Sequence, residues 1–125
     1  MTGQRQVKVA RIYDDPSDDD GVRVLVDRLW PRGMSKAKAQ LDDWRKDVAP
    51  STELRKWYGH REEHFAEFRR RYLSELGDPD RAESLKGLRD LAATGPVTLL
   101  TATKRADISE AAVLAELLLV STSER

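Results

Sequence analysis

Apolar and polar residues are spaced along this chain in ways that predict three strands. Over residues 7–13 they alternate, which is typical of a half-buried strand. Residues 24–26 form a continuous aliphatic run, as expected for a strand that is buried on both faces, and residues 97–101 have the same character. Residues 41–47 are expected to be extended or irregular.

Helical spacing, with apolar residues recurring every three or four positions, predicts four helices between and after these strands. They are expected to begin near Ser51, Glu62, Asp80 and Asp107, and the first should end at Gly59. Asp80 and Asp107 each precede a glutamate by three residues, and we therefore expect both to cap a helix.

One charged residue interrupts the apolar side of the second helix. Arg69 stands about 40° from Phe65 around the helix axis, among the aromatic and leucine residues of the stripe. A cation there can pair with a carboxylate, extend toward solvent or contact an anionic ligand. The ion pair is the favoured interpretation, because buried charges are usually paired.

The order strand, strand, helices, strand, helix predicts the α/β class, as a small single domain with a mainly parallel sheet flanked by helices. We expect residues 1–125 to form this one domain, with a core over about residues 7–120 and short flexible termini. The sequence has no internal repeat and no low-complexity linker that would divide it.

Charge and composition narrow the range of functions. The 22 basic and 22 acidic residues cancel to a net charge of +0, whereas proteins that coat DNA without specificity are strongly basic. Without cysteine the chain can form neither a disulfide, nor a thiolate metal site, nor a cysteine nucleophile. No signal-peptide pattern and no run of apolar residues long enough for a bilayer is found, so we expect a cytoplasmic protein that avoids membranes.

Strong charges follow two of the predicted strands. Asp27, Arg28 and Arg32 come directly after the second strand, and Lys104 follows the third. If these strands are parallel neighbours, the side chains meet at one edge of the sheet, where arginine and lysine favour a phosphate or a carboxylate. The role of Asp27 stays open between general base, nucleophile and a partner that only orients Arg32.

Two histidines four residues apart, His60 and His64, raise the question of a zinc site. The zinc protease motif has a glutamate directly after its first histidine, where this chain has Arg61, and no third ligand is found. The aspartate-rich segment 14–21 lacks the spacing of a calcium loop and is expected to be solvated. We therefore expect no metal and, without a nucleotide-binding glycine motif, no cofactor. His60 remains a candidate for proton transfer beside the basic edge.

The three tryptophans are a further source of candidates. Trp57 is expected in the core. Trp30 and Trp44 lie near basic residues, Arg32 for the first and Lys46 for the second, and could either fill the core or stack on a base.

Four segments carry a resemblance to a known family. They read RVLVDRLWPRGMSK (23–36), LDDWRKDVAPSTELRKWYGH (41–60), EFRRRYLSEL (67–76) and PVTLLTATK (96–104). The chain resembles the YeaO-like branch of the domain of unknown function 488 family from Val7 to about Leu118. This resemblance implies a compact cytoplasmic α/β protein, and it supplies no established activity.

The resemblance also marks residues that match the family signature. They are Asp27, Arg28, Arg32, Trp44, Lys46, Asp47, Glu53, Arg55, Trp57, His60, Tyr72 and Lys104. One departure concerns Ile108 and Glu110, which stand where related members have histidines. If the protein is an enzyme, Asp27 and His60 are therefore better catalytic candidates than this last segment.

Two functions fit these residues, and the sequence leaves open whether the protein is an enzyme. In the first, a small anion is bound at the carboxyl ends of the strands, with hydrolase-type chemistry at Asp27. In the second, a non-catalytic module senses an anionic ligand or engages a nucleic acid or a protein, with the basic run 69–71 taking part. The residues expected to bind the ligand are Arg28, Arg32, Trp44, Lys46, Arg55 and Lys104, and those expected to catalyse are Asp27 and His60. A small anion is the preferred partner, nucleic acid is less favoured, and monomer and homodimer stay open.

Overall fold

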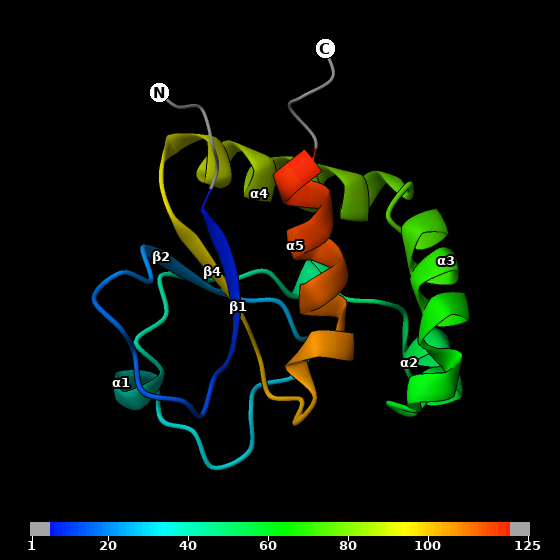
Figure 1. Ribbon diagram of the computed structural model, residues 1–125, viewed down its shortest axis with the longest axis horizontal. Coiled ribbons are helices and arrows are strands. Elements are labelled where there is room, and N and C mark those ends of the chain that lie inside the picture. Colours follow the sequence, from blue (N-terminus) through cyan, green and yellow to red (C-terminus); the bar gives the residue numbers. More distant parts are fainter. Residues whose placement is uncertain (1–5, 121–125) are drawn as a thin grey trace.

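Within residues 6–120, which the computed structural model describes, four parallel strands form the sheet on which the helices pack (Figure 1). The strands are β1 (Val7–Arg11), β2 (Val22–Leu25), β3 (Asp43–Trp44) and β4 (Val97–Thr101). The helices are α1 (Lys36–Ala39), α2 (Thr52–Tyr58), α3 (Phe65–Glu75), α4 (Pro79–Thr94) and α5 (Glu110–Val120). The strand order is β1-β4-β2-β3 and every neighbouring pair is parallel, which confirms the predicted α/β class and parallel sheet.

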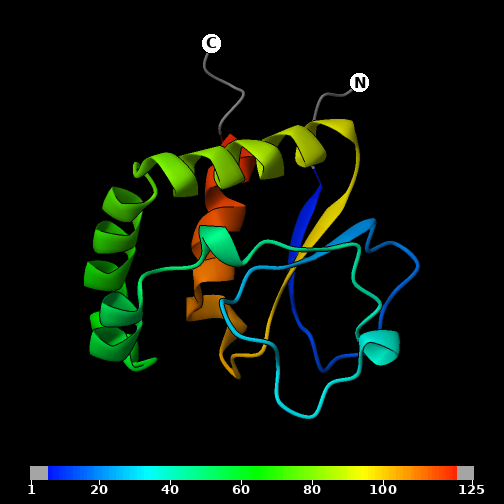
Figure 2. The same ribbon diagram turned by 180° about the vertical axis from the view of Figure 1, so that it is seen from behind.

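The two faces of the sheet bury side chains in two cores of unequal size. Val24 and Leu99 point into the larger core, which helices α2 to α5 complete. Leu25 and Leu100, the next residues along the same strands, point into the smaller core on the other face. The smaller core also contains Ile12, Met34 and Ala39. Figure 2 shows the chain between β2 and β3, which carries α1, passing over this second face. The strand at 24–26 is therefore buried on both faces, as predicted.

The register of the sheet decides where the strand ends meet. β4 is central, and its Val97 pairs with Val7 of β1 on one side and with Val22 of β2 on the other. Because all these strands run in one direction, the carboxyl ends of β1, β2 and β4 meet at one edge, which is where open α/β sheets bind ligands.

The helices largely follow the predicted stripes. Ser51 caps α2 by accepting a hydrogen bond from the backbone N–H of Leu54 at 3.1 Å, and Gly59 ends this helix with a φ of 54°. Arg69 forms the predicted ion pair, with its Nη2 atom 2.8 Å from the carboxylate of Glu116 on α5. This half-exposed pair joins α3 to α5 at the surface.

Three predictions about local structure were wrong. Asp78, and not Asp80, occupies the cap position of α4, because Pro79 is already its first helical residue. Asp107 does not cap α5, because it lies in a short 3-10 turn and pairs with Arg105 at 2.9 Å. Trp57 is 37% exposed, since the buried side of α2 is formed by other residues.

The aspartate-rich loop is only partly solvated. Asp20 is buried and its carboxylate lies 2.6 Å from Nη1 of Arg23, with Lys8 at 2.9 Å. Burial alone would raise the pKa of Asp20, but hydrogen bonds from the Ser17 backbone, Lys8 and Arg23 outweigh it and lower the pKa to about 2. This aspartate therefore has a structural role in fixing the entry to β2.

The remaining expectations concern the ends of the chain and the membrane. The predicted flexible termini lie outside the residues that the structure describes. Over residues 6–120 no helix combines the length and the apolar character that a membrane crossing requires.

Candidate functional site

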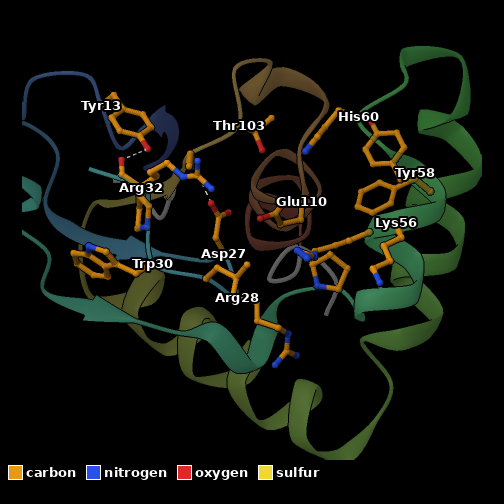
Figure 3. A pocket seen from close by; sticks show the side chains of 16 residues that line it. Tyr13, Asp27, Arg28, Trp30, Arg32, Lys56, Tyr58, His60, Thr103 and Glu110 are labelled. Carbon is orange, nitrogen blue, oxygen red and sulfur yellow. Dashed lines mark hydrogen bonds between the residues drawn. The ribbon is translucent and has the colours of Figure 1, made fainter. Parts of the chain in front are cut away.

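A pocket of about 520 Å³ opens at the carboxyl ends of the strands (Figure 3). Asp27 follows β2, Thr103 follows β4 and Tyr13 follows β1, so three parallel strands deliver residues to it. The opposite wall comes from α2, with Lys56 and Tyr58, as Figure 3 shows. The pocket thus lies at the edge that the sequence indicated.

Five of the eight predicted site residues line this pocket, namely Asp27, Arg28, Arg32, Arg55 and His60. The other three, Trp44, Lys46 and Lys104, do not line it. Lys104 follows the lining residue Thr103 but is exposed, so the expected meeting of Lys104 with the charges after β2 is not observed.

Trp44 and Lys46 nevertheless lie close behind the site. The indole N–H of Trp44 donates a 2.7 Å hydrogen bond to the backbone carbonyl of Asp27. The ammonium of Lys46 lies 4.9 Å from the centre of the Trp44 ring, and Trp30 meets the same ring edge-on at 5.4 Å. These residues support the strand end that carries Asp27.

Four cations of the pocket, Arg28, Arg32, Arg55 and Lys56, form no ion pair with any residue of the described chain. The Nε atoms of Arg28 and Arg55 are buried and have no hydrogen-bond acceptor within residues 6–120. Most other arginines there are paired with carboxylates: Arg23, Arg45, Arg69, Arg70, Arg71, Arg81 and Arg105. The pocket therefore brings together four cations that have no ion-pair partner among the described residues.

Asp27 is held by the end of the neighbouring strand. Its Oδ1 accepts a 2.8 Å hydrogen bond from the hydroxyl of Thr101, and its Oδ2 accepts one of 2.8 Å from the backbone N–H of Ala102. The Thr101 hydroxyl in turn accepts from the N–H of Thr103 at 3.2 Å. The alternative that Asp27 orients Arg32 finds no support, because these bonds fix the carboxylate on β4.

A second carboxyl group, Glu110, faces Asp27 from the start of α5 (Figure 3). Burial raises the pKa of Glu110 well above its ordinary value of 4.5, and the hydrogen bond with Asp27 and the charge of that residue raise it further. The positive charge of Arg55 acts in the opposite direction without reversing the shift. Burial and Asp27 therefore both favour the protonated form of Glu110, in which its carboxyl group is a hydrogen-bond donor.

Aromatic residues complete the walls. The hydroxyl of Tyr58 donates a 2.7 Å hydrogen bond to the carbonyl of Ile108, and burial raises the pKa of Tyr58 to about 12. The imidazole of His60 lies beside the Tyr58 ring, with centroids 5.9 Å apart. His60 has a φ of 58°, a left-handed conformation that is uncommon for any residue with a side chain. On the other side, the hydroxyl of Tyr13 donates to the carbonyl of Arg32 at 2.9 Å.

Sequence reasoning missed Glu110, Lys56 and the tyrosines of this pocket. The sequence predicts Glu110 as part of a helix cap and otherwise marks it only as a departure from the family, at a position where related members have a histidine. Burial and contact with Asp27 arise from the packing of α5 against β1 and β4, which the spacing of residues does not encode. As to metals, no group of three or more His, Cys, Asp or Glu side chains within residues 6–120 is placed to hold an ion.

Comparisons with known proteins give a consistent picture. Residues 6–125 match the family model described as "Inactive DUF488-N3 subclade". The Uncharacterized protein Rv3073c of Mycobacterium tuberculosis is 50% identical over 118 residues, which are 94% of this chain and 98% of the relative. The Uncharacterized protein YeaO of Escherichia coli is 43% identical over 110 residues, which are 88% and 94% of the two chains. No solved structure matches the chain.

Proposed function

The chain belongs to the Inactive DUF488-N3 subclade, and from this membership and the shape of its pocket we propose that it binds a small anionic ligand without converting it. The resemblance noted in the sequence is thereby confirmed at the level of the family. The ligand site is the pocket at the carboxyl ends of β1, β2 and β4.

The observation that carries this proposal is the group of four unpaired cations. Placing Arg28, Arg32, Arg55 and Lys56 around one hollow without carboxylate partners leaves them repelling each other. An anion relieves that repulsion, and guanidinium groups offer a phosphate or carboxylate two hydrogen bonds at once.

Two features favour binding over catalysis. Both oxygens of Asp27 already accept hydrogen bonds from β4, which lowers their availability as a base or a nucleophile. The subclade to which the chain belongs is itself described as inactive. Hydrolase-type chemistry at Asp27, with His60 transferring protons, therefore remains the second candidate.

Nucleic acid is a weaker candidate as partner. The basic run that suggested it is mostly compensated, since Arg70 and Arg71 share the carboxylate of Glu67, at 2.5 and 2.7 Å, and Arg69 pairs with Glu116. Arginines that are already paired contribute little to the release of counterions that drives binding to nucleic acid.

A thermal-shift screen tests the proposal. Inorganic phosphate, nucleoside monophosphates, sugar phosphates and small carboxylates are each added to the wild type, Arg32→Ala and Arg55→Ala. A ligand at about 100 times its Kd should add about 2.7 kcal/mol to the free energy of unfolding, which raises Tm by several degrees. Both variants should lose most of that shift.

Arg70→Ala is the matched control, because Arg70 lies outside the pocket and its exposed ion pair contributes little to stability. This variant should respond to the ligand like the wild type. An equal response of all four proteins would place binding elsewhere. Spectra of the ligand after long incubation separate the two candidates, because a new product would support catalysis.

A further inference from the structure

The pocket brings two carboxyl groups, Asp27 and Glu110, into the same space as its cations. The arginines and Lys56 attract an anion, whereas the negative charge of Asp27 repels one. A fully ionised anion would therefore meet attraction and repulsion in the same small volume. The ligand preference of this pocket therefore depends on Asp27 as well as on the cations.

We propose that the pocket selects an oxyanion that carries a proton of its own, with hydrogen phosphate as the simplest case, over a fully ionised oxyanion such as sulfate. The inference rests on the proposed anion-binding function and specifies its ligand. A proton on the anion converts repulsion by Asp27 into a hydrogen bond, because a carboxylate acts only as an acceptor. Sulfate carries no proton at neutral pH and cannot form this bond.

Asp27 is oriented for this selection. The Thr101 hydroxyl and the Ala102 N–H each donate one bond to it, both of 2.8 Å. An ionised carboxylate offers about four lone-pair sites, so these two bonds and the one with Glu110 still leave acceptor capacity on the side that lines the pocket. Thr101 is fully buried, and turning Asp27 away would leave its hydroxyl without an acceptor. The carboxylate therefore stays in place as the ligand enters.

The burial of Glu110 beside Asp27 favours a single negative charge on the acid pair. Glu110 is only 8% exposed and its side chain points toward Asp27 (Figure 3). The elevated pKa of its carboxyl, caused by burial and by Asp27, agrees with a single proton shared by the two acids. The other groups that act on Glu110 are Arg55 of α2, with its opposing charge, and the hydroxyls of Tyr58 and Tyr72, which carry no charge at neutral pH.

Calorimetric titrations with inorganic phosphate and with sulfate, at neutral pH and matched ionic strength, test the inference. The wild type should bind phosphate about tenfold or more tightly than sulfate, the factor expected for a hydrogen bond to a charged group. Asp27→Asn removes the charge with little change of shape and should bring the two affinities to within about threefold. Glu83→Gln, which removes an exposed carboxylate of α4 outside this pocket, is the control and should retain the preference.

The results of these titrations distinguish a failure of the proposed selection from a failure of anion binding itself. If sulfate binds the wild type as tightly as phosphate, and Arg32→Ala weakens both, the selection by a proton is refuted and anion binding stands. If neither anion binds, the anion-binding function itself fails. The wild-type ratio of affinities suffices for this decision even if Asp27→Asn does not fold.

Discussion

At the scale of single residues, the acid pair is the feature that most sets this pocket apart. Glu110 starts α5, where an ionised carboxylate would normally be stabilised by the free backbone N–H groups of a helix end. Here burial and the neighbouring Asp27 outweigh that stabilisation and raise the pKa of the side chain. A buried acid with a raised pKa makes the stability of the protein depend on pH.

We predict that Glu110→Gln removes part of this pH dependence. The pKa of Glu110 is higher in the folded protein than its ordinary value of 4.5, so the folded state retains a proton that the unfolded chain releases above that value. The stabilisation is complete below pH 4.5 and is lost as the pH rises toward the folded-state pKa, with a slope of at most about 1.4 kcal/mol per pH unit. Glutamine keeps a donor toward Asp27 and has no such slope.

Denaturant titrations of both proteins at several pH values measure this effect. As the pH rises above 4.5, the free energy of unfolding of the variant should increase relative to that of the wild type. Glu83→Gln, an exposed position on α4, is the control and should follow the wild type. A constant difference between Glu110→Gln and wild type across the range would show that the pKa of Glu110 is not raised.

Site residues that directly follow a clearly predicted strand could be identified from the sequence. Asp27, Arg28 and Arg32 follow a strand whose aliphatic run is unambiguous, so their position at the edge of the sheet could be inferred. Lys104 also follows a strand, but spacing does not tell which way a side chain turns once the strand has ended. Glu110 required knowledge of how α5 packs, which no local pattern contains.

At the scale of elements, the approach of the loop before β2 to the start of β4 is the tightest contact described. Gly21 has a φ of 66°, and a Cβ atom built there would lie within 2.7 Å of the Pro96 Cβ atom and closer still to its carbonyl oxygen. The next residue, Val22, donates its N–H to that same carbonyl at 3.0 Å. A side chain at position 21 therefore conflicts with the bond that begins the pairing of β2 and β4.

We predict that Gly21→Ala destabilises the protein by about 2 kcal/mol or more, because strain and steric conflict add together. Gly33→Ala is the matched comparison, since Gly33 has a similar φ of 75° but no atom within 4 Å of the added Cβ. It should lose only about 1 kcal/mol. Chemical denaturation measures both, and equal losses would contradict a role for the contact with Pro96.

Helices and strands could be predicted where their buried residues recur at a regular spacing over several turns or positions. The buried strands and the stripes of α3 and α4 left a clear period in the sequence, and they were found. β3 has only two residues, too few to show alternation, and was expected only as extended or irregular chain. The caps of α4 and α5 were misplaced, because an aspartate near a helix start fits several positions of the first turn equally well.

At the scale of the whole molecule, a net charge of +0 conceals an uneven distribution. Ion pairs engage the arginines on the outer surface of α3, while the cations of the pocket form none within the described chain. The two cores are uneven as well, and the segment that carries Arg32 rests on the smaller one. The pocket therefore joins a firmly packed wall, formed by α2, to a lightly packed one.

We predict that phosphate slows amide hydrogen exchange more in residues 29–40 than in α4. The smaller core gives this segment few buried contacts, so it should open locally at a lower free energy than the helices do. A ligand bound to Arg32 and Arg55 stabilises the closed form by mass action. Exchange measured by mass spectrometry with and without phosphate tests this. Equal protection of both regions without ligand would contradict the uneven packing.

The pairing of β1 with β4 also has a consequence for how the chain folds. Val7 pairs with Val97, so β1, which precedes the other strands of this sheet along the chain, has no neighbour until β4 has been synthesised. The entropy cost of closing such a long loop must be met before the contacts between β1 and β4 can stabilise the protein. Folding should therefore be slower than that of a helical bundle of similar size. During that interval the apolar side of β1 is exposed to other chains. Lys8, which pairs with Asp19 and Asp20 in the folded protein, places a charge on the unpaired strand and so opposes aggregation through it.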